Sequence, residues 1–176
     1  MRSSLQKTLQ TALPISLLAS TLVFSNGCPA PGPISTLPVL RKDPVSLTLP
    51  RVGGGSLSLE DLQGKKVYIV FFSTWCRTCG VVFNRLLRLQ ATLGKKNLSI
   101  VGISVDRDPR LLNVYVETLN LPFPILYSTP RALMVSGIGR VRGVPTLLLL
   151  DRKGRPRAIR SQLMTTRAMG RLMNRL

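Results

Sequence analysis

The sequence lacks histidine altogether and contains only three cysteines among its 176 residues. A closed zinc site needs four ligands, drawn mainly from cysteine, histidine and carboxylate side chains. Cys76 and Cys79 form a CxxC pair, but the third cysteine, Cys28, lies far away along the chain. This shortage of ligands argues against a zinc site, and we predict neither a metal nor another cofactor.

Acidic residues are also scarce, since 25 Lys and Arg stand against 7 Asp and Glu. Ten of the basic residues fall between Arg140 and Leu176, where Asp151 is the only acid and aromatic residues are absent. A nucleic-acid module usually interleaves aromatic with basic side chains, so nucleic acid is not a favoured partner. We expect instead a solvated basic face attracted to anionic lipid headgroups or to an acidic partner. Adaptation of a whole proteome to an unusual medium would give the same composition.

The N-terminus has no apolar run long enough for a comfortable membrane span. Residues 11–24 form a mostly apolar stretch that follows Arg2 and Lys7. A spanning helix needs about 20 apolar residues, whereas a shorter run after a basic start is typical of a signal peptide. We therefore predict that residues 1–27 are a signal peptide or N-terminal membrane anchor, and that the protein is exported to the periplasm or another extracytoplasmic site. An uncleaved, weakly anchored segment remains the alternative.

Cys28 follows residues 25–27 in a pattern that resembles the cleavage and acylation site of bacterial lipoproteins. The resemblance implies lipidation of Cys28, and the alternative is an incidental free cysteine. Residues 28–43 are rich in proline, which blocks regular backbone pairing and keeps a chain extended. We predict a tether over residues 28–43 and one folded domain over residues 44–176.

The CxxC pair lies between an apolar run, residues 67–72, and a helical pattern that begins near Val81. Two thiols separated by two residues at the start of a helix can close a small disulfide ring, and the helix N-terminus favours the thiolate. This pattern predicts redox chemistry with Cys76 as the nucleophile and Cys79 as the resolving thiol. A fixed structural disulfide is the alternative.

The rest of the domain alternates strand patterns with helix patterns and contains no internal repeat, which predicts an α/β layer structure. Apolar periodicity places Arg85 and Arg88 where they can point away from the core of their helix. The predicted strands are residues 46–49, 67–72, 99–105 and 146–150, and the predicted helical segments are residues 58–62, 81–93, 109–120 and a C-terminal helix with Met169, Leu172, Met173 and Leu176 on one face.

Five segments, taken in order, resemble the thioredoxin superfamily and specifically its exported TlpA/ResA-like thiol-disulfide oxidoreductases. They are Leu59–Lys65, Trp75–Cys79, Val101–Asp106, Gly143–Thr146 and Asp151–Gly154. The similarity runs from about residue 45 to the C-terminus. It implies a thioredoxin-like fold with a central mixed β-sheet flanked by helices.

The resemblance also implies roles for individual residues. Cys76 would be the exposed nucleophile and Cys79 the buried resolving cysteine. Pro145 would be a cis-proline whose preceding residue, Val144, pairs its backbone with an incoming substrate, and Trp75 would join that substrate-binding surface. A trans proline that merely begins a strand is the alternative for Pro145.

One departure from the family concerns proton transfer. The resemblance implies a buried acid six residues before the first cysteine or three after the second, but this chain has Val70 and Val82 there. The usual proton acceptor for the resolving thiol is therefore missing. Water, a backbone group or the substrate must take that proton, or the protein turns over slowly.

The sequence as a whole predicts an exported, membrane-associated thiol-disulfide oxidoreductase that acts on protein cysteines through mixed disulfides. Its partners would be protein thiol or disulfide substrates and a membrane redox partner, and the resemblance suggests cytochrome c maturation. One alternative is a peroxiredoxin-like peroxidase, although Thr74 lies only two residues before Cys76 and that chemistry resembles a Thr-x-x-Cys arrangement. The other is a membrane-tethered binding module with a structural disulfide.

Overall fold

The computed structural model of the chain describes residues 43–138 and 141–176. The predictions for residues 1–27, for Cys28 and for nearly all of the tether concern residues outside these ranges. No helix within the two ranges is long and apolar enough to cross a membrane.

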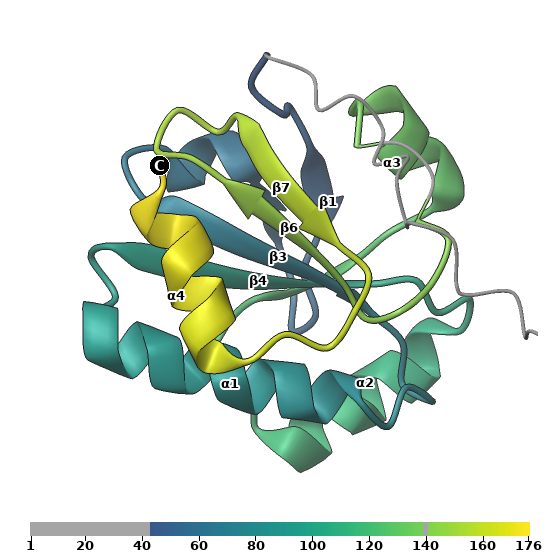
Figure 1. Cartoon of the computed structure of the whole chain (residues 1–176). Coiled ribbons are helices and arrows are strands. Elements are labelled where there is room, and N and C mark those ends of the chain that lie inside the picture. Colours follow the sequence, from purple (N-terminus) through teal and green to yellow (C-terminus); the bar gives the residue numbers. More distant parts are fainter. Residues whose placement is uncertain (1–42, 139–140) are drawn as a thin grey trace, which may run out of the picture. The chain divides into compact units, whose positions relative to one another are not determined.

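A five-stranded mixed sheet forms the centre of the domain, with the strand order β5-β4-β3-β6-β7 (Figure 1). The strands β4 and β5 run parallel to β3, whereas β6 runs antiparallel to β3 and β7 antiparallel to β6. This arrangement is the predicted thioredoxin-like architecture. The strands of this sheet are β3 (Lys66–Phe72), β4 (Leu98–Ser104), β5 (Ile125–Tyr127), β6 (Thr146–Leu150) and β7 (Pro156–Arg160).

The two faces of β3 are covered by two separate cores. Tyr68, Val70 and Phe72 point into a core formed with α1 (Cys79–Leu93), α2 (Pro109–Leu119) and α4 (Thr166–Asn174). The alternate residues of β3, which are Val67, Ile69 and Phe71, point into a second core. Burial on both faces explains why β3 reads as one continuous apolar run. The second core is closed by β1 (Thr48–Pro50), β2 (Ser56–Ser58), the short 3-10 helix η1 (Leu59–Leu62) and α3 (Pro130–Val135).

The sequence predicted the long elements and also β1 and η1, but it missed β2, β5, α3 and β7. The strands β2 and β5 have three residues each and α3 has six, which is too short for a periodic pattern to emerge. The strand β7 begins with Pro156 and has arginine at two of its five positions, Arg157 and Arg160, so it lacked an apolar signal. Arg85 also differs from expectation. It is half-buried, and its guanidinium donates a hydrogen bond to the Met164 carbonyl (2.8 Å) rather than pointing away.

Tyr68 connects the central strand to the C-terminal helix. Its ring is buried in the first core, and its hydroxyl donates a hydrogen bond to the Met169 carbonyl (2.9 Å). Burial raises the pKa of the Tyr68 phenol above its usual value, because ionisation would place a charge in an apolar setting. The phenol therefore stays protonated in the folded state at a pH at which it ionises in the unfolded chain.

We expect Tyr68→Phe to change how stability depends on alkaline pH. In the parent, the unfolded state loses this proton above about pH 10 while the folded state keeps it, so the free energy of unfolding falls as the pH rises. The variant should be less stable by about 1 kcal/mol at pH 8, because one hydrogen bond is lost, and should then lose less stability between pH 9 and pH 11. Urea unfolding at a series of pH values measures both effects. Tyr127→Phe, whose hydroxyl bonds Asn113 at the surface, is the control, and an identical alkaline slope for parent and Tyr68→Phe would contradict the assignment.

Candidate active site

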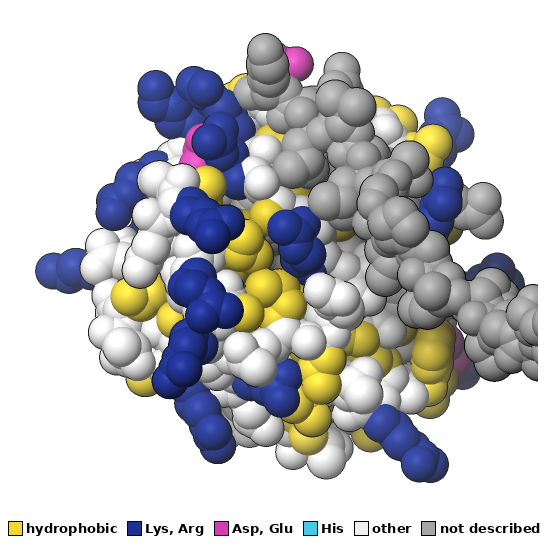
Figure 2. Space-filling model, in the orientation of Figure 1, with side chains coloured by type: hydrophobic (Ala, Val, Ile, Leu, Met, Phe, Trp, Pro, Cys, Tyr) yellow, Lys and Arg dark blue, Asp and Glu magenta, His cyan; other side chains and the backbone are white. Residues whose placement is uncertain are grey.

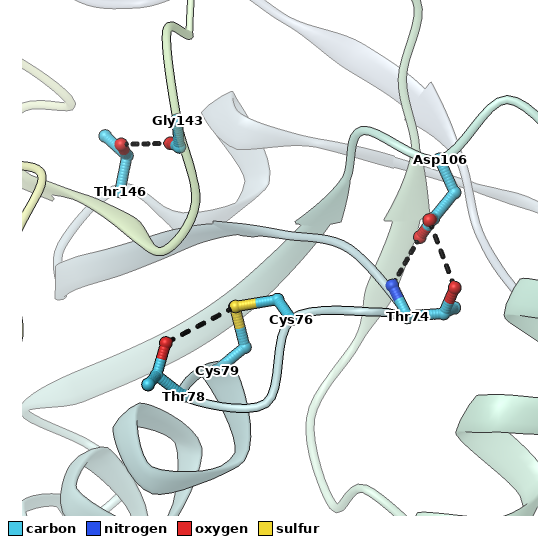
Figure 3. The surroundings of a disulfide bond; sticks show 7 residues. All are labelled: Thr74, Cys76, Thr78, Cys79, Asp106, Gly143 and Thr146. Carbon is cyan, nitrogen blue, oxygen red and sulfur yellow. Dashed lines mark hydrogen bonds between the residues drawn. A yellow bond between two sulfur atoms is a disulfide. The ribbon is translucent and has the colours of Figure 1, made fainter.

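The CxxC pair lies where the chain passes from β3 to α1, and it is closed by a disulfide (Figure 3). The Cα atoms of Cys76 and Cys79 are 5.4 Å apart. Two backbone hydrogen bonds shape the turn, from the Cys76 N–H to the Ser73 carbonyl and from the Cys79 N–H to the Cys76 carbonyl, each 3.1 Å long. The helix α1 begins at Cys79, so Cys76 lies in the turn before the helix and not in its first turn as we expected.

The two sulfurs differ in their surroundings. Cys76 keeps 8% of its surface exposed, whereas Cys79 is fully buried. Val70 and Val82 are also fully buried and belong to the same core as both cysteines. These two valines stand where the family resemblance implied an acid, and they surround Cys79 with apolar atoms. Desolvation of this kind disfavours a Cys79 thiolate.

Thr78 is the one hydrogen-bonding side chain that reaches a cysteine sulfur within the described ranges. Its hydroxyl lies 3.7 Å from Cys76 Sγ (Figure 3). After reduction of the disulfide, this hydroxyl can donate to a Cys76 thiolate. Together with exposed Arg77 next to Cys76, it favours negative charge on the outer of the two sulfurs.

Asp106 is a site residue that the sequence reasoning did not single out. Its carboxylate accepts hydrogen bonds from the Thr74 N–H (2.9 Å), from the Thr74 hydroxyl (3.1 Å) and from the Ser104 hydroxyl (2.8 Å). Phe72 and Ser104 are register partners on β3 and β4, so the residues that follow these two strands meet at one edge of the sheet. Asp106 thereby fixes the start of the segment that carries Cys76 (Figure 3).

The same contacts bear on the peroxidase alternative. The Thr74 hydroxyl donates to Asp106 and is directed toward that carboxylate, away from the disulfide (Figure 3). Nothing in this geometry favours a peroxidase role for Thr74.

We expect Asp106→Asn to loosen the segment before the cysteines. An asparagine offers one acceptor oxygen in place of two and turns an N–H₂ group toward the Thr74 donors. The expected loss in the free energy of unfolding is about 1.5 to 3 kcal/mol, the usual value for hydrogen bonds to a charged group. Urea unfolding measures it.

The neighbouring substitution Asp108→Asn is the matched control. Asp108 caps α2 by accepting from the Arg110 N–H and also pairs with the Arg110 guanidinium at the surface. Asparagine caps helices about as well as aspartate, and an exposed ion pair contributes little, so this variant should lose less than about 1 kcal/mol. Equal losses in the two variants would show that Asp106 has no special role.

The peptide bond between Val144 and Pro145 is cis, the geometry that the resemblance implied. Pro145 is buried, Val144 is half-buried, and β6 begins at the next residue, Thr146. Because Thr146 pairs with Phe71 near the end of β3, this segment lies at the same sheet edge as the cysteines. Val144 packs against the core that contains both of them.

The backbone of Val144 forms no hydrogen bond within the described ranges. The turn around it is held instead by Thr146, whose hydroxyl donates to the Gly143 carbonyl (2.6 Å, Figure 3). Trp75, the residue directly before Cys76, has 74% of its surface exposed. The structure thus brings the predicted residues Cys76, Cys79, Val144 and Pro145 together, and leaves Trp75 accessible beside them.

Comparison with known proteins identifies the family. Residues 41–157 match the model of the AhpC/TSA family. The thioredoxin-like protein YneN of Bacillus subtilis is 30% identical over 125 residues, which cover 69% of this chain and 71% of YneN. The thiol-disulfide oxidoreductase ResA of Bacillus cereus is 25% identical over 116 residues, which cover 66% of each chain.

Solved structures agree with the fold. A thiol:disulfide interchange protein of the thioredoxin family from Chlorobium tepidum superposes with a TM-score of 0.66 at 24% identity, covering 77% of this chain and 96% of that protein. The exposed lipoprotein thioredoxin Etrx1 of Streptococcus pneumoniae superposes with a TM-score of 0.63 at 21% identity, covering 74% of this chain and 99% of that protein. At these identities the structures support the thioredoxin-like fold.

Proposed function

We propose, from the premise that this chain belongs to the AhpC/TSA family and is a thioredoxin-like thiol-disulfide oxidoreductase, that Cys76 and Cys79 exchange electrons with cysteines of other proteins. One observation carries the proposal. The Cys76–Cys79 disulfide follows the carboxyl end of the central strand, with 8% of the Cys76 residue surface exposed and Cys79 fully buried. Because Cys76 is the more exposed of the two cysteines, it attacks the substrate first, and buried Cys79 attacks Cys76 afterwards.

In the reducing direction, the Cys76 thiolate attacks one sulfur of a substrate disulfide. A mixed disulfide forms, and the other substrate sulfur leaves as a thiolate that takes up a proton. Cys79 then loses its proton and attacks Cys76 Sγ, which releases the second substrate sulfur and restores the Cys76–Cys79 disulfide. The substrate gains two electrons and the protein loses two. The same steps reversed would oxidise a substrate dithiol.

We assign substrate positioning to Val144, Pro145 and Trp75. The backbone groups of Val144, which form no hydrogen bond with the described residues, lie against the core that contains the cysteines and can pair with an extended substrate segment, as an added strand does. Exposed Trp75 offers an apolar surface next to Cys76 in the chain. Protein substrates with cysteines in extended segments fit this arrangement.

Reduction of insulin disulfides tests the chemistry. The full chain, with dithiothreitol as the electron source, should accelerate precipitation of the insulin B chain well above the rate with dithiothreitol alone. A rate equal to that of dithiothreitol would contradict the proposal and favour the binding-module alternative.

We further propose that the protein is exported and held at a membrane by residues 1–27 or by acylated Cys28, with residues 28–43 as a tether to a domain of residues 44–176. The sequence pattern supports this location, and two proteins of like fold are described as an exposed lipoprotein and as secreted. The substrates would be proteins of cytochrome c maturation or other exported proteins that contain cysteines. The redox partner would be a membrane protein.

Cys28→Ala separates the two anchors. If acylation holds the protein, this variant should move from the membrane to the soluble exported fraction, as cell fractionation would show. Unchanged membrane retention would assign the anchor to the apolar segment, and cytosolic protein with residues 1–27 intact would contradict export.

A further inference from the structure

Basic side chains from four separate segments gather at the amino edge of the sheet, where β3 and β4 begin. The Lys66 N–H donates to the Asn97 carbonyl (3.2 Å), which places the loop with Lys95 and Lys96 beside the start of β3. The Lys66 ammonium donates to the Met173 carbonyl (2.6 Å), which places the end of α4 at the same edge.

The turn between β6 and β7 completes this surface. The Gly64 N–H donates to the Arg152 carbonyl (2.8 Å), and the Arg152 guanidinium donates back to the Gly64 carbonyl (3.1 Å). We call the whole set the amino-edge basic surface. It consists of Lys65, Lys66, Lys95, Lys96, Arg152, Lys153, Arg155, Arg171 and Arg175.

Four acids lie at or near this edge against the nine cations, and one of them, Asp43, precedes Pro44 and Val45 at the turn with Gly154. Asp151 lies among the cations, but its carboxylate accepts from the N–H groups of Lys153 and Arg155 and so stabilises the turn. Glu60 and Asp61 on nearby η1 accept from Ser58. Within the two described ranges, the one ion pair joins Arg110 to Asp108, at the start of α2. Figure 2 shows Lys and Arg side chains spread over the face that carries α4 and β7, with few acids among them.

The chain enters the domain at this same edge. The Val45 N–H donates to the Gly154 carbonyl (3.0 Å), in the turn between β6 and β7. The predicted tether therefore joins the domain beside the amino-edge basic surface. The Cys76–Cys79 disulfide follows the opposite end of β3, a strand of seven residues or about 20 Å.

We propose that the amino-edge basic surface binds anionic phospholipid headgroups and holds the cysteine pair facing away from the bilayer. The proposal rests on the membrane association proposed above. The side chains of the amino-edge basic surface are exposed or half-exposed, come from separate turns and helix ends, and are long and flexible. Such spread positive charge suits a diffuse anionic surface, and each Lys or Arg near it adds to the attraction. Attachment of the tether at this edge keeps the surface close to the membrane.

Vesicle binding of the full chain tests the inference. The protein should bind vesicles of equal parts phosphatidylglycerol and phosphatidylcholine more tightly than vesicles of phosphatidylcholine alone, and the difference should shrink as salt is raised. Insertion of the apolar N-terminal segment would contribute to both vesicle types, so the difference between them reports the basic surface.

Two variants with the same loss of charge locate the binding surface. The amino-edge variant combines Lys95→Gln, Lys96→Gln, Arg171→Gln and Arg175→Gln, and the control combines Arg51→Gln, Arg107→Gln, Arg131→Gln and Arg142→Gln, all at exposed positions. The amino-edge variant should lose the preference for anionic vesicles by about a hundredfold or more, at the usual contribution per basic residue, and the control should lose much less. Insulin reduction in the absence of lipid should be unchanged in the amino-edge variant, which keeps this test separate from that of the redox function.

Trp75 reports the orientation, because it is the only tryptophan of the sequence and it is exposed next to Cys76. On anionic vesicles its fluorescence should remain open to iodide and should not be quenched by brominated lipid. Quenching by brominated lipid would overturn the orientation. Equal losses in the two variants would overturn the assignment of the surface, and the absence of any preference for anionic vesicles would overturn lipid as the partner and leave an acidic protein.

Discussion

The Cys79→Ser variant is expected to accumulate as a covalent complex with its partner protein, and the Cys76→Ser variant to trap nothing. The reason is the unequal exposure of the two cysteine residues, 8% for Cys76 and none for Cys79. A substrate disulfide can reach Cys76, whereas Cys79 can reach only the Cys76 sulfur. Removal of Cys79 leaves the mixed disulfide without the thiol that resolves it. The complex should appear on a non-reducing gel and disappear on reduction.

Both variants should lose nearly all multiple-turnover insulin reduction, by about a hundredfold or more, because each removes a thiol that the cycle requires. Cys28→Ser controls for the loss of a thiol outside the pair and should keep parent activity. In the parent, release of the substrate should speed up as the pH rises toward the usual thiol pKa of about 8.5 or above, since Val70 and Val82 provide no acid to accept the Cys79 proton. Trapping by Cys76→Ser in place of Cys79→Ser would reverse the assigned roles.

The second large effect is expected from Gly102→Val in β4. A Cβ atom at Gly102 would lie 2.4 Å from Ile125 Cδ1 and 3.1 Å from Phe72 Cε1. Both neighbours are buried, and the Phe72 ring also packs edge-on against Phe83 of α1, at 5.1 Å between centroids. The two further methyl groups of valine would force these side chains apart. We expect a loss of about 2 to 3 kcal/mol in the free energy of unfolding, as is usual for an overpacked core.

Gly170→Ala in α4 is the control with the opposite sign. Its new Cβ would meet Leu89 Cδ1 at 3.5 Å, an ordinary contact, and alanine favours the helix over glycine by about 0.5 to 1 kcal/mol. Urea unfolding should show a gain for Gly170→Ala and a loss for Gly102→Val. A Gly102→Val protein as stable as the parent would mean that the core around Phe72 yields easily.

The sequence was sufficient to predict the long elements and the cysteine pair, because both depend on local signals. A continuous apolar run shows that β3 is buried on both faces, and the CxxC spacing is visible without the fold. The family resemblance also pointed to Val70 and Val82, and the structure has both in the same core as Cys79.

Asp106 and Arg85 could not be assigned in this way. The contact of Asp106 with Thr74 depends on the register of β4 against β3, which no short pattern encodes. Arg85 occupies a position that helical periodicity places outside the core, yet the segment before α4 supplies the Met164 carbonyl that its guanidinium binds. Both roles arise from contacts between distant segments of the chain.

The antiparallel pairing of β6 with β3 also has a consequence for the order of synthesis. Phe71 and Thr146 are partners across these strands, so the segment with Val144 reaches the cysteines only after most of the chain exists. The two thiols are made long before the backbone that would select their substrates. Because this pairing joins segments far apart in the sequence, the site is complete only once β6 has paired with β3.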